Sequence, residues 1–218
     1  MKRFRPRRAR PHPVASLLPA LAALSACGPI VQLGAPAGPP PAQHVLAEAP
    51  PAPPAGGAGA VDPATALTLL AATAPAMLQT TRIPVRVGAT EVRYIVGHAW
   101  TEPPARLFMQ TLDARLAAEG VPVMDRRITG RSAAHVLGGE LLEFGVDERG
   151  PVVRIRFEAT LTGPKGIRRQ SFKREEPIDR IEGPTAAAAL SRGSAEVAAD
   201  IARWVATVMR ADATRQPA

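Results

Sequence analysis

The residue with the clearest chemical role in the sequence is Cys27, the only cysteine of the chain. It follows Leu24-Ser25-Ala26, and these four residues match the bacterial lipobox. The small residues before the cysteine let an extended backbone enter a peptidase site, and only a thiol can accept a diacylglyceryl group as a thioether. Cleavage before Cys27 then frees its amine for a further acyl chain. We therefore predict lipidation at Cys27. One acyl chain anchors a protein only marginally, and a further acyl chain makes the anchor firm.

Residues 1–26 have the organisation of a lipoprotein signal peptide. The first 13 residues carry six basic residues and no acidic one, and residues 14–26 are apolar except for two serines. This apolar run is shorter than the roughly 20 residues of a membrane-spanning helix, and it contains Pro19. We therefore predict no transmembrane helix. Arg7-Arg8 leaves a twin-arginine export signal as a less favoured alternative, because the hydrophobic residues expected after such a pair are missing.

The residue after the cysteine bears on the choice of membrane. Gly28 stands at the position where an aspartate favours retention in the inner membrane. By resemblance to the sorting rules of enteric bacteria, the sequence predicts attachment to the outer membrane, on its periplasmic face.

Side chains that serve in catalysis are present, but no motif frames them. His98, Asp113, Ser132 and His135 are the nearest approach to a catalytic triad. The sequence has no Gly-x-Ser-x-Gly elbow, no His-Glu-x-x-His pattern and no phosphate-binding loop. A metal held by His98 and His135 would need further ligands. We therefore predict no catalytic residues, no metal site, no cofactor and no enzymatic activity.

The positive charge of the chain is concentrated in its leader. The net charge is +8, from 27 basic and 19 acidic residues, yet six of the basic residues precede residue 14 and no acidic residue precedes Cys27. The rest of the chain is nearly neutral, whereas a nucleic-acid-binding domain carries a basic stripe on its folded part. We predict no nucleic-acid partner. The single cysteine also excludes a disulfide framework within the chain.

We interpret residues 27–64 as the lipidated cysteine followed by a tether rich in proline, alanine and glycine. Ten of the 24 prolines fall between residues 28 and 63, and such a composition buries too little apolar surface to fold. Extended at about 3.1 Å per residue, the tether would span on the order of 100 Å. His44 lies within it and is expected to be solvated. Residues 213–218 are expected to form a flexible tail.

One domain is expected over residues 65–212. Its clearest strand, residues 152–163, alternates between an apolar and a polar face. The order of elements is strands, a helix, a strand meander and a long helix. It predicts an α+β fold, an antiparallel-rich sheet with two helices packed on one face. The predicted strands are 65–71, 82–87, 91–96, 135–146, 152–163 and 168–178, and the predicted helices run from Thr101 to Gly120 and from Gly183 to about Arg210.

Three details of these elements can be checked against a structure. Pro84 places its strand at a sheet edge or near a strand start. Val92, Tyr94 and Val96 fall on one face of the following strand. Thr101 is the expected N-cap of the first helix, because its hydroxyl can accept a hydrogen bond from a free backbone N–H of the first turn.

Several stretches of the sequence form a set when they are taken in order. They are Leu33-Gly34-Ala35-Pro36, Arg82-Ile83-Pro84-Val85-Arg86, Tyr94 with Trp100-Thr101-Glu102-Pro103, Leu112 with Arg115-Leu116, the strand Val136-Leu137-Gly138-Gly139-Glu140-Leu141-Leu142-Glu143-Phe144, and Trp204 near the end of the last helix. Together with the lipobox they resemble the ABC-type transport auxiliary lipoproteins, which accompany bacterial MCE-type systems that move lipids between the two membranes. Two features depart from the family pattern: the tether is unusually long, and the aromatic residue expected before Leu33 is absent.

The resemblance implies a non-enzymatic lipoprotein subunit that docks the inner-membrane-anchored MCE component at the outer membrane. Its partners would be an MCE-family protein with the ABC permease and ATPase, and the membrane itself through the lipid anchor. Candidate partner contacts are Trp100, Glu102, Arg126 and Arg127, although Trp100 is more simply explained as a packing anchor and the arginine pair as a solvated loop. The sequence leaves open whether the protein is a homo-oligomer.

Two other functions remain open from the sequence. The domain can be a stand-alone periplasmic lipoprotein that carries a lipid between its sheet and its helices. Alternatively, it can be an assembly lipoprotein of the outer membrane. The sequence does not separate these alternatives from the docking function, because none of the three needs a catalytic motif.

Overall fold

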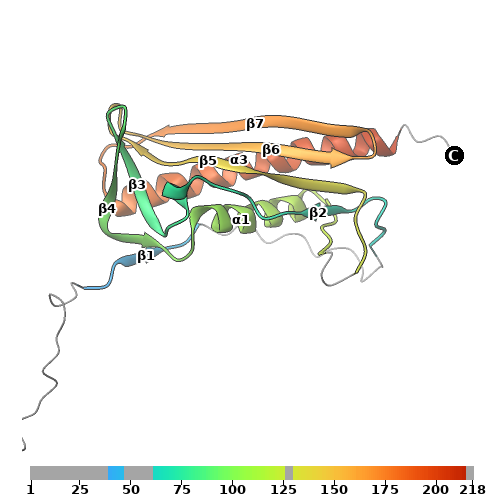
Figure 1. Cartoon of the computed structure of the whole chain (residues 1–218), viewed down its shortest axis with the longest axis horizontal. Helices are drawn as coiled ribbons and strands as arrows, with labels where there is room; N and C mark the ends of the chain where they lie inside the picture. Colours follow the sequence, from blue (N-terminus) through green and yellow to red (C-terminus); the bar gives the residue numbers. More distant parts are fainter. Residues whose placement is uncertain (1–38, 47–60, 126–129, 215–218) are drawn as a thin grey trace, which may run out of the picture. The chain divides into compact units, whose positions relative to one another are not determined.

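A seven-stranded sheet with two helices packed against it makes up the fold (Figure 1). The structure is a computed structural model that describes residues 39–46, 61–125 and 130–214. These residues belong to one folded unit, Pro39–Ala218, which contains the whole described core. The strands are β1 (Ala42–His44), β2 (Leu67–Leu69), β3 (Arg82–Val87), β4 (Glu91–Trp100), β5 (His135–Asp147), β6 (Val152–Gly163) and β7 (Gly166–Pro177); the helices are α1 (Pro104–Ala118) and α3 (Gly183–Ala213), with a short 3-10 turn η1 (Ala76–Leu78).

The sheet is mixed, with a long antiparallel part. Its strands lie in the order β1-β4-β3-β5-β6-β7, and β2 pairs with β5 off this path. The pairs β3–β4, β5–β6 and β6–β7 are antiparallel, whereas β1–β4, β2–β5 and β3–β5 are parallel and short. Gly163 pairs with Gly166 across the turn between β6 and β7. The predicted meander and the α+β class are confirmed.

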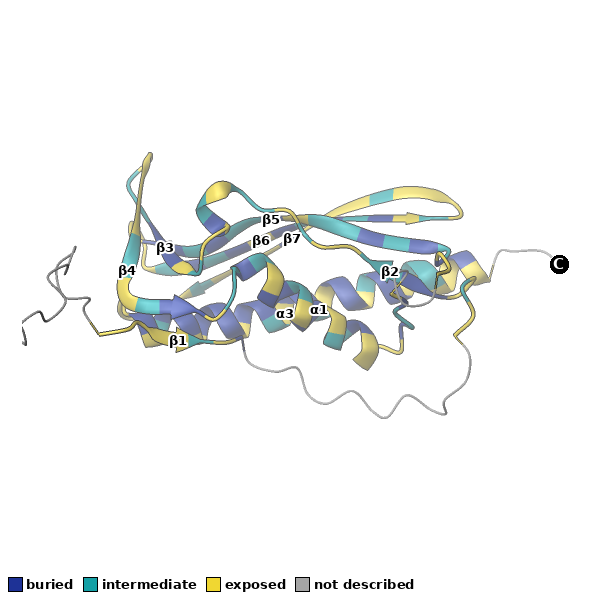
Figure 2. Ribbon diagram, turned by 60° about the horizontal axis from the view of Figure 1, so that its bottom comes forward, coloured by how far each residue is buried: buried dark blue, intermediate teal, exposed yellow. Residues whose placement is uncertain are grey.

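Both helices cover the same face of the sheet. On β6, every second residue from Val153 to Leu161 is buried, as the alternation predicts. Phe157 on that face meets Phe108 of α1, with ring centroids 5.0 Å apart, and Ile155 lies against α3. Figure 2 shows the buried residues gathered between the helices and the sheet. The expectation of two helices on one face is therefore confirmed.

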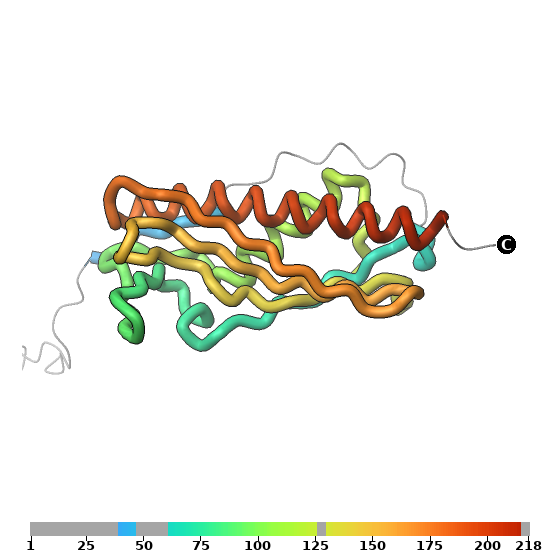
Figure 3. The backbone as a smooth tube through the Cα atoms, turned by 90° about the horizontal axis from the view of Figure 1, so that it is seen from above, coloured from blue at the N-terminus to red at the C-terminus, as the bar shows by residue number. Residues whose placement is uncertain are grey.

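Helix α3 lies along the long direction of β5, β6 and β7 (Figure 3) and packs closely on them. A Cβ at Gly193 would lie 2.8 Å from Cδ1 of Ile155, so glycine permits this approach. The close packing explains why α3 contains Gly193, although glycine destabilises a helix by about 1 kcal/mol relative to alanine. In the part of the chain that the structure describes, no helix combines the length and the apolarity needed to cross a membrane.

Helix α1 begins later than the sequence suggests. Its N-cap is Pro103, and no side chain caps it, so the prediction of Thr101 as N-cap is wrong. The reason is that the Thr101 backbone still belongs to the sheet edge, where its N–H donates to the His44 carbonyl at 2.9 Å. The apolar stripe and the end of the helix are as expected: Gly120 has a φ of 73°. The buried residues of α1 include the predicted stripe of Phe108, Leu112 and Leu116.

The first strand lies inside the segment interpreted as a tether. Ala42–His44 pairs in parallel with the last residues of β4, from His98 to Trp100. His44 is half-buried and Leu46 is 7% exposed within the main core. The expectation of a solvated His44 is therefore wrong. The surrounding proline-rich composition conceals a short strand that depends on a partner more than 50 residues away.

Pro84 occupies one of its two expected positions in β3, whereas the apolar face expected on β4 is largely exposed. β3 lies between β4 and β5 and is not an edge strand. Pro84 instead falls at a register irregularity near the start of β3, which is the other position that a strand tolerates for proline. On β4, Tyr94 is half-buried, but Val96 is 89% exposed and Val92 is 37% exposed. The shared apolar face of these residues therefore contributes little to the core.

Candidate functional site

The predicted contact residues divide between the described part of the chain and the rest. Cys27, Arg126 and Arg127 lie outside the described residues. Trp100 is completely buried, so its side chain is not available for a direct contact in this packing. Glu102 remains partly exposed. Its carboxylate accepts a hydrogen bond of 3.1 Å from Gln110 and forms an ion pair of 3.0 Å with Arg106. Of the two described candidates, only Glu102 stays on a surface.

Trp100 belongs to a corner where β1 meets β4. Its ring makes an edge contact with Phe144, at a centroid distance of 5.5 Å, and with His44, at 6.1 Å. His44 also stacks on His98, and the two rings share a hydrogen bond of 3.0 Å between Nε2 of His44 and Nδ1 of His98. The first residue of α3, Gly183, lies so close to the His98 ring that a Cβ would overlap it. This corner therefore fastens the N-terminal segment to the sheet.

The corner should make folding stability depend on pH. Burial, and after it the charge of His98, lower the pKa of His44 below its ordinary value of 6.5. As the pH falls through about 6.5, the unfolded chain takes up a proton on His44 that the folded chain does not bind. The free energy of unfolding is therefore expected to decrease on acidification from pH 7.5 to 5.5. Urea titrations at a series of pH values measure it, and His44→Gln should show a flatter profile. An equally steep profile in His44→Gln would contradict this assignment.

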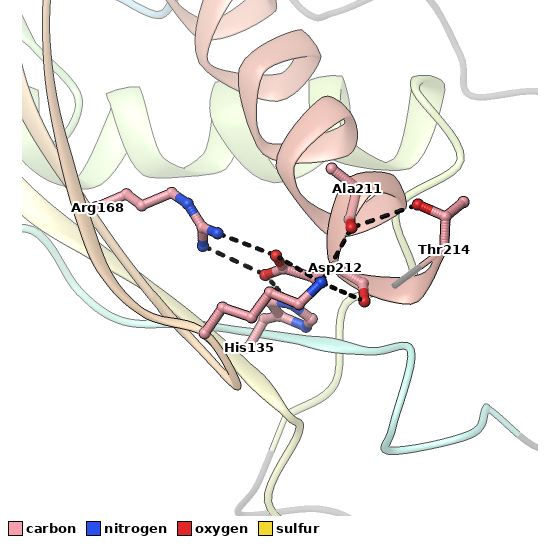
Figure 4. Close-up of polar contacts among 6 residues, drawn as sticks. His135, Arg168, Ala211, Asp212 and Thr214 are labelled. Carbon is pink, nitrogen blue, oxygen red and sulfur yellow. Dashed lines mark hydrogen bonds and ion pairs between the residues drawn. The ribbon is translucent and has the colours of Figure 1, made fainter. Parts of the chain in front are cut away.

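A second polar cluster lies at the opposite end of α3 (Figure 4). The Asp212 carboxylate is 3% exposed and accepts two hydrogen bonds from Arg168, of 3.0 and 3.3 Å. Nε2 of His135, on β5, lies 3.3 Å from the same carboxylate. Lys165 donates to the backbone carbonyls of Ala211 (3.1 Å) and Asp212 (3.0 Å). The cluster thus joins the β6–β7 turn, the start of β5 and the last turn of α3.

Physical chemistry explains why these residue types meet here. The last carbonyls of a helix have no partner within the helix, and the negative end of its dipole favours cations, so Lys165 satisfies both. Burial by itself raises the pKa of Asp212, but the hydrogen bonds from Arg168 and His135, with the charges of Arg168 and Lys165, outweigh it and hold the pKa below its ordinary value. Asp212 therefore stays ionised.

A cavity of about 410 Å³ adjoins this cluster. It lies between the end of α1, the last two turns of α3, the segment before β2 and the start of β5. Apolar atoms make up most of its surface. The residues that line it are Ala64, Thr65, Glu119, Gly120, Val121, Pro122, His135, Pro164, Ala206, Met209, Arg210, Asp212 and Ala213.

This cluster is not among the sites predicted from the sequence, although the sequence contains two signals of it. Phe172 is buried at 8% exposure, and Arg168, four residues earlier on β7, shares its inward face. Asp212 extends the apolar series of α3 that includes Ile201 and Val205. A charged residue on each of two inward faces indicates an ion pair, but the sequence does not say that the two meet.

The four catalytic candidates do not form one site. His98 contacts His44, whereas His135 contacts Asp212. Burial raises the pKa of Asp113, which has no hydrogen-bonding contact to His98, Ser132 or His135. Within residues 39–46, 61–125 and 130–214, no three or more metal-ligating side chains lie close enough to hold a metal ion.

Comparison with known proteins agrees with the fold. The structure is similar to protein XCC0632 from Xanthomonas campestris, with 18% identity, a TM-score of 0.66, and coverage of 79% of this chain and 99% of that one. It is also similar to the crystal structure of an uncharacterized protein, with 16% identity, a TM-score of 0.60, and coverage of 77% and 99%. At such identities the likeness concerns the fold. No curated protein matches the chain.

A family comparison goes further. The model of the family described as the ABC-type transport auxiliary lipoprotein component matches residues 44–202. The match begins at His44, the last residue of β1, and extends well into α3, so it overlaps the segment interpreted as a tether. It covers more than half of the chain, in agreement with the resemblance drawn from the sequence motifs. The chain belongs to the ABC-type transport auxiliary lipoprotein component family.

Proposed function

We propose that this protein is a non-enzymatic, lipid-anchored subunit of an MCE-type lipid transport system, attached through Cys27 to the periplasmic face of the outer membrane. Its folded unit docks the MCE component that is anchored in the inner membrane. The observation that carries the proposal is the family match over residues 44–202, combined with the lipobox ending at Cys27. The permease and the ATPase supply the energy, since the sequence has no phosphate-binding loop.

The position of β1 limits how far the folded unit reaches from its anchor. Because Ala42 is already paired in the sheet, only residues 28–41 connect it to Cys27. These residues span at most about 50 Å, at no more than about 3.6 Å each. The reach is about half of what a tether up to residue 64 would allow. The MCE partner is therefore met close to the outer membrane.

The docking surface in this proposal lies near the start of α1. Glu102 is partly exposed there, while the buried Trp100 holds the adjoining β4 in place. Arg126 and Arg127 stay predicted contacts from the sequence alone. A change of charge at Glu102 is thus the mildest way to disturb the contact, since the residue packs little into the core.

The test is a crosslinked pulldown of the full-length protein from membranes, with partners identified by mass spectrometry. The wild type should recover an MCE-family protein or its permease. Cys27→Ser should move the protein from the membrane to the soluble fraction, because the acyl anchor is lost; Ser16→Ala, in the apolar part of the signal peptide, should leave it attached. Recovery of an outer-membrane assembly complex alone, or of no partner, would contradict docking. Membrane retention of Cys27→Ser would contradict the anchor.

A further inference from the structure

We propose that the cavity at the end of α3 binds a single acyl-chain amphiphile whose head group presents a hydroxyl to His135. The volume of about 410 Å³ lies in the range typical of small-molecule sites, about 300–1,000 Å³. The inference stands on the cavity and its polar end. It does not depend on the docking function, since an isolated folded unit contains the whole site.

The walls of the cavity suit a hydrocarbon chain. Val121 and Pro122 follow α1, and Ala206 and Met209 lie on α3. Methionine adapts its shape to irregular apolar ligands. Pro164, in the turn between β6 and β7, completes the apolar surface. The cavity is open on one side, so a chain can enter without unfolding of the surrounding elements.

His135 supplies the polar end. The residue is 3% exposed, and Nε2 faces the Asp212 carboxylate at 3.3 Å. Its second nitrogen, Nδ1, is buried and has no hydrogen-bond partner among the described residues. A buried polar atom without a partner is rare, and it often indicates a group that is absent from the structure. Because His135 also lines the cavity, an occupant can complete its hydrogen bonding.

The surrounding charges select the type of head group. Besides His135, the ionisable residues that line the cavity are Glu119, Arg210 and Asp212. Asp212 is already paired with Arg168 and Lys165, so the lining itself leaves one guanidinium, Arg210, against the carboxylate of Glu119 and offers a carboxylate head group no uncompensated cation. A hydroxyl donates to a bare imidazole nitrogen and accepts from a protonated one, so it satisfies His135 in either state. A neutral hydroxyl head group is therefore the best match.

The experiment uses the chain from residue 39 to 218, which contains every described element and the core but neither the signal peptide nor Cys27. The probes are 1-monooleoylglycerol, methyl oleate and oleate, each titrated by native mass spectrometry. We expect one molecule of monooleoylglycerol per chain. Its affinity should exceed that of methyl oleate, which has no hydroxyl, by about tenfold, the usual value of one hydrogen bond. Oleate should also bind more weakly.

Two variants locate the binding site. Ala213→Trp places a large ring at the exposed edge of the cavity and should weaken binding of monooleoylglycerol by about tenfold or more. Ala211→Trp is the matched control, since Ala211 is exposed on the same helical turn but does not line the cavity. It should bind as the wild type does. Equal binding by both variants, or no binding by the wild type, would overturn the proposal.

A third variant tests the role of His135 itself. His135→Phe keeps a ring of similar size but removes both nitrogens. It should abolish the preference for monooleoylglycerol over methyl oleate while leaving methyl oleate binding unchanged. The binding of methyl oleate separates a ligand contact of His135 from a purely structural function, because loss of a structural function would weaken the binding of both probes. Circular dichroism and the Tm establish that the variant is folded; a folded variant that keeps the preference would refute the contact.

Discussion

Replacing Asp212 by alanine is expected to lower the free energy of unfolding by about 2–4 kcal/mol. The carboxylate is 3% exposed and neutralises Arg168, which is 34% exposed, and it also faces the buried His135. Its removal leaves a guanidinium and an imidazole near the core without their acceptor. The loss stays below the upper end known for buried pairs, because Arg168 can turn partly toward water. Urea unfolding followed by circular dichroism measures the change.

A matched control on the same helix is Asp200, whose ion pair with Arg203 lies on the surface. Asp200→Ala should cost less than about 1 kcal/mol, as exposed pairs usually do. A double-mutant cycle then isolates the buried pair: in an Arg168→Met background, Asp212→Ala should cost clearly less than in the wild type. Equal losses of unfolding free energy for Asp212→Ala and Asp200→Ala would show that the buried ion pairs of Asp212 stabilise the fold no more than an exposed pair does.

The contribution of Asp212 to stability is also expected to depend on pH. Because the pKa of Asp212 is below its ordinary value of 3.8, the unfolded chain binds the proton first on acidification. The stabilisation is therefore complete above about pH 5 and is lost as the pH falls through the folded-state value. The difference in unfolding free energy between the wild type and Asp212→Asn should stay constant from pH 7 to 5 and shrink below pH 4. A difference that grows in acid would contradict the assignment.

The parts of the fold that the sequence predicts are those with a local pattern. The alternation from Val153 to Leu161 identifies β6, because a strand with one buried face must repeat every two residues. The apolar spacing of α1 and α3 identifies the helices for the same reason. These elements require only neighbouring residues to be recognised, and the strand meander follows from the short turn at Pro164-Lys165.

The parts that the sequence does not predict depend on distant residues. β1 is three residues long, and its pairing with His98–Trp100 has no local signal beyond Leu46. Asp212 lies 44 positions from Arg168 in the sequence and 77 positions from His135. Composition even points the wrong way at β1, since the prolines around it favour a tether. Such pairing between distant segments depends on how the whole core packs, and the local sequence of each segment does not reveal it.

The largest effect of a single core substitution is expected at Trp100. Trp100→Ala should lower the free energy of unfolding by about 3–5 kcal/mol, the usual cost of emptying a buried aromatic site. The ring is fully buried against Phe144 and His44, so its loss also loosens β1. Trp204 is the matched control: it is half-buried beside Phe172, at a ring distance of 5.7 Å, and Trp204→Ala should cost less.

Trp100→Phe separates packing from partner contact. Phenylalanine restores most of the lost apolar contact, and it removes an indole Nε1 that is buried without a hydrogen-bond partner among the described residues. The variant should therefore recover most of the stability lost in Trp100→Ala, and it should recover the proposed MCE partner in the crosslinked pulldown as the wild type does. Glu102→Lys should show the reverse, with stability near that of the wild type and a weakened contact. A stable Trp100→Phe protein that no longer recovers the partner would assign Trp100 a direct function in docking, since packing alone would then not explain the loss.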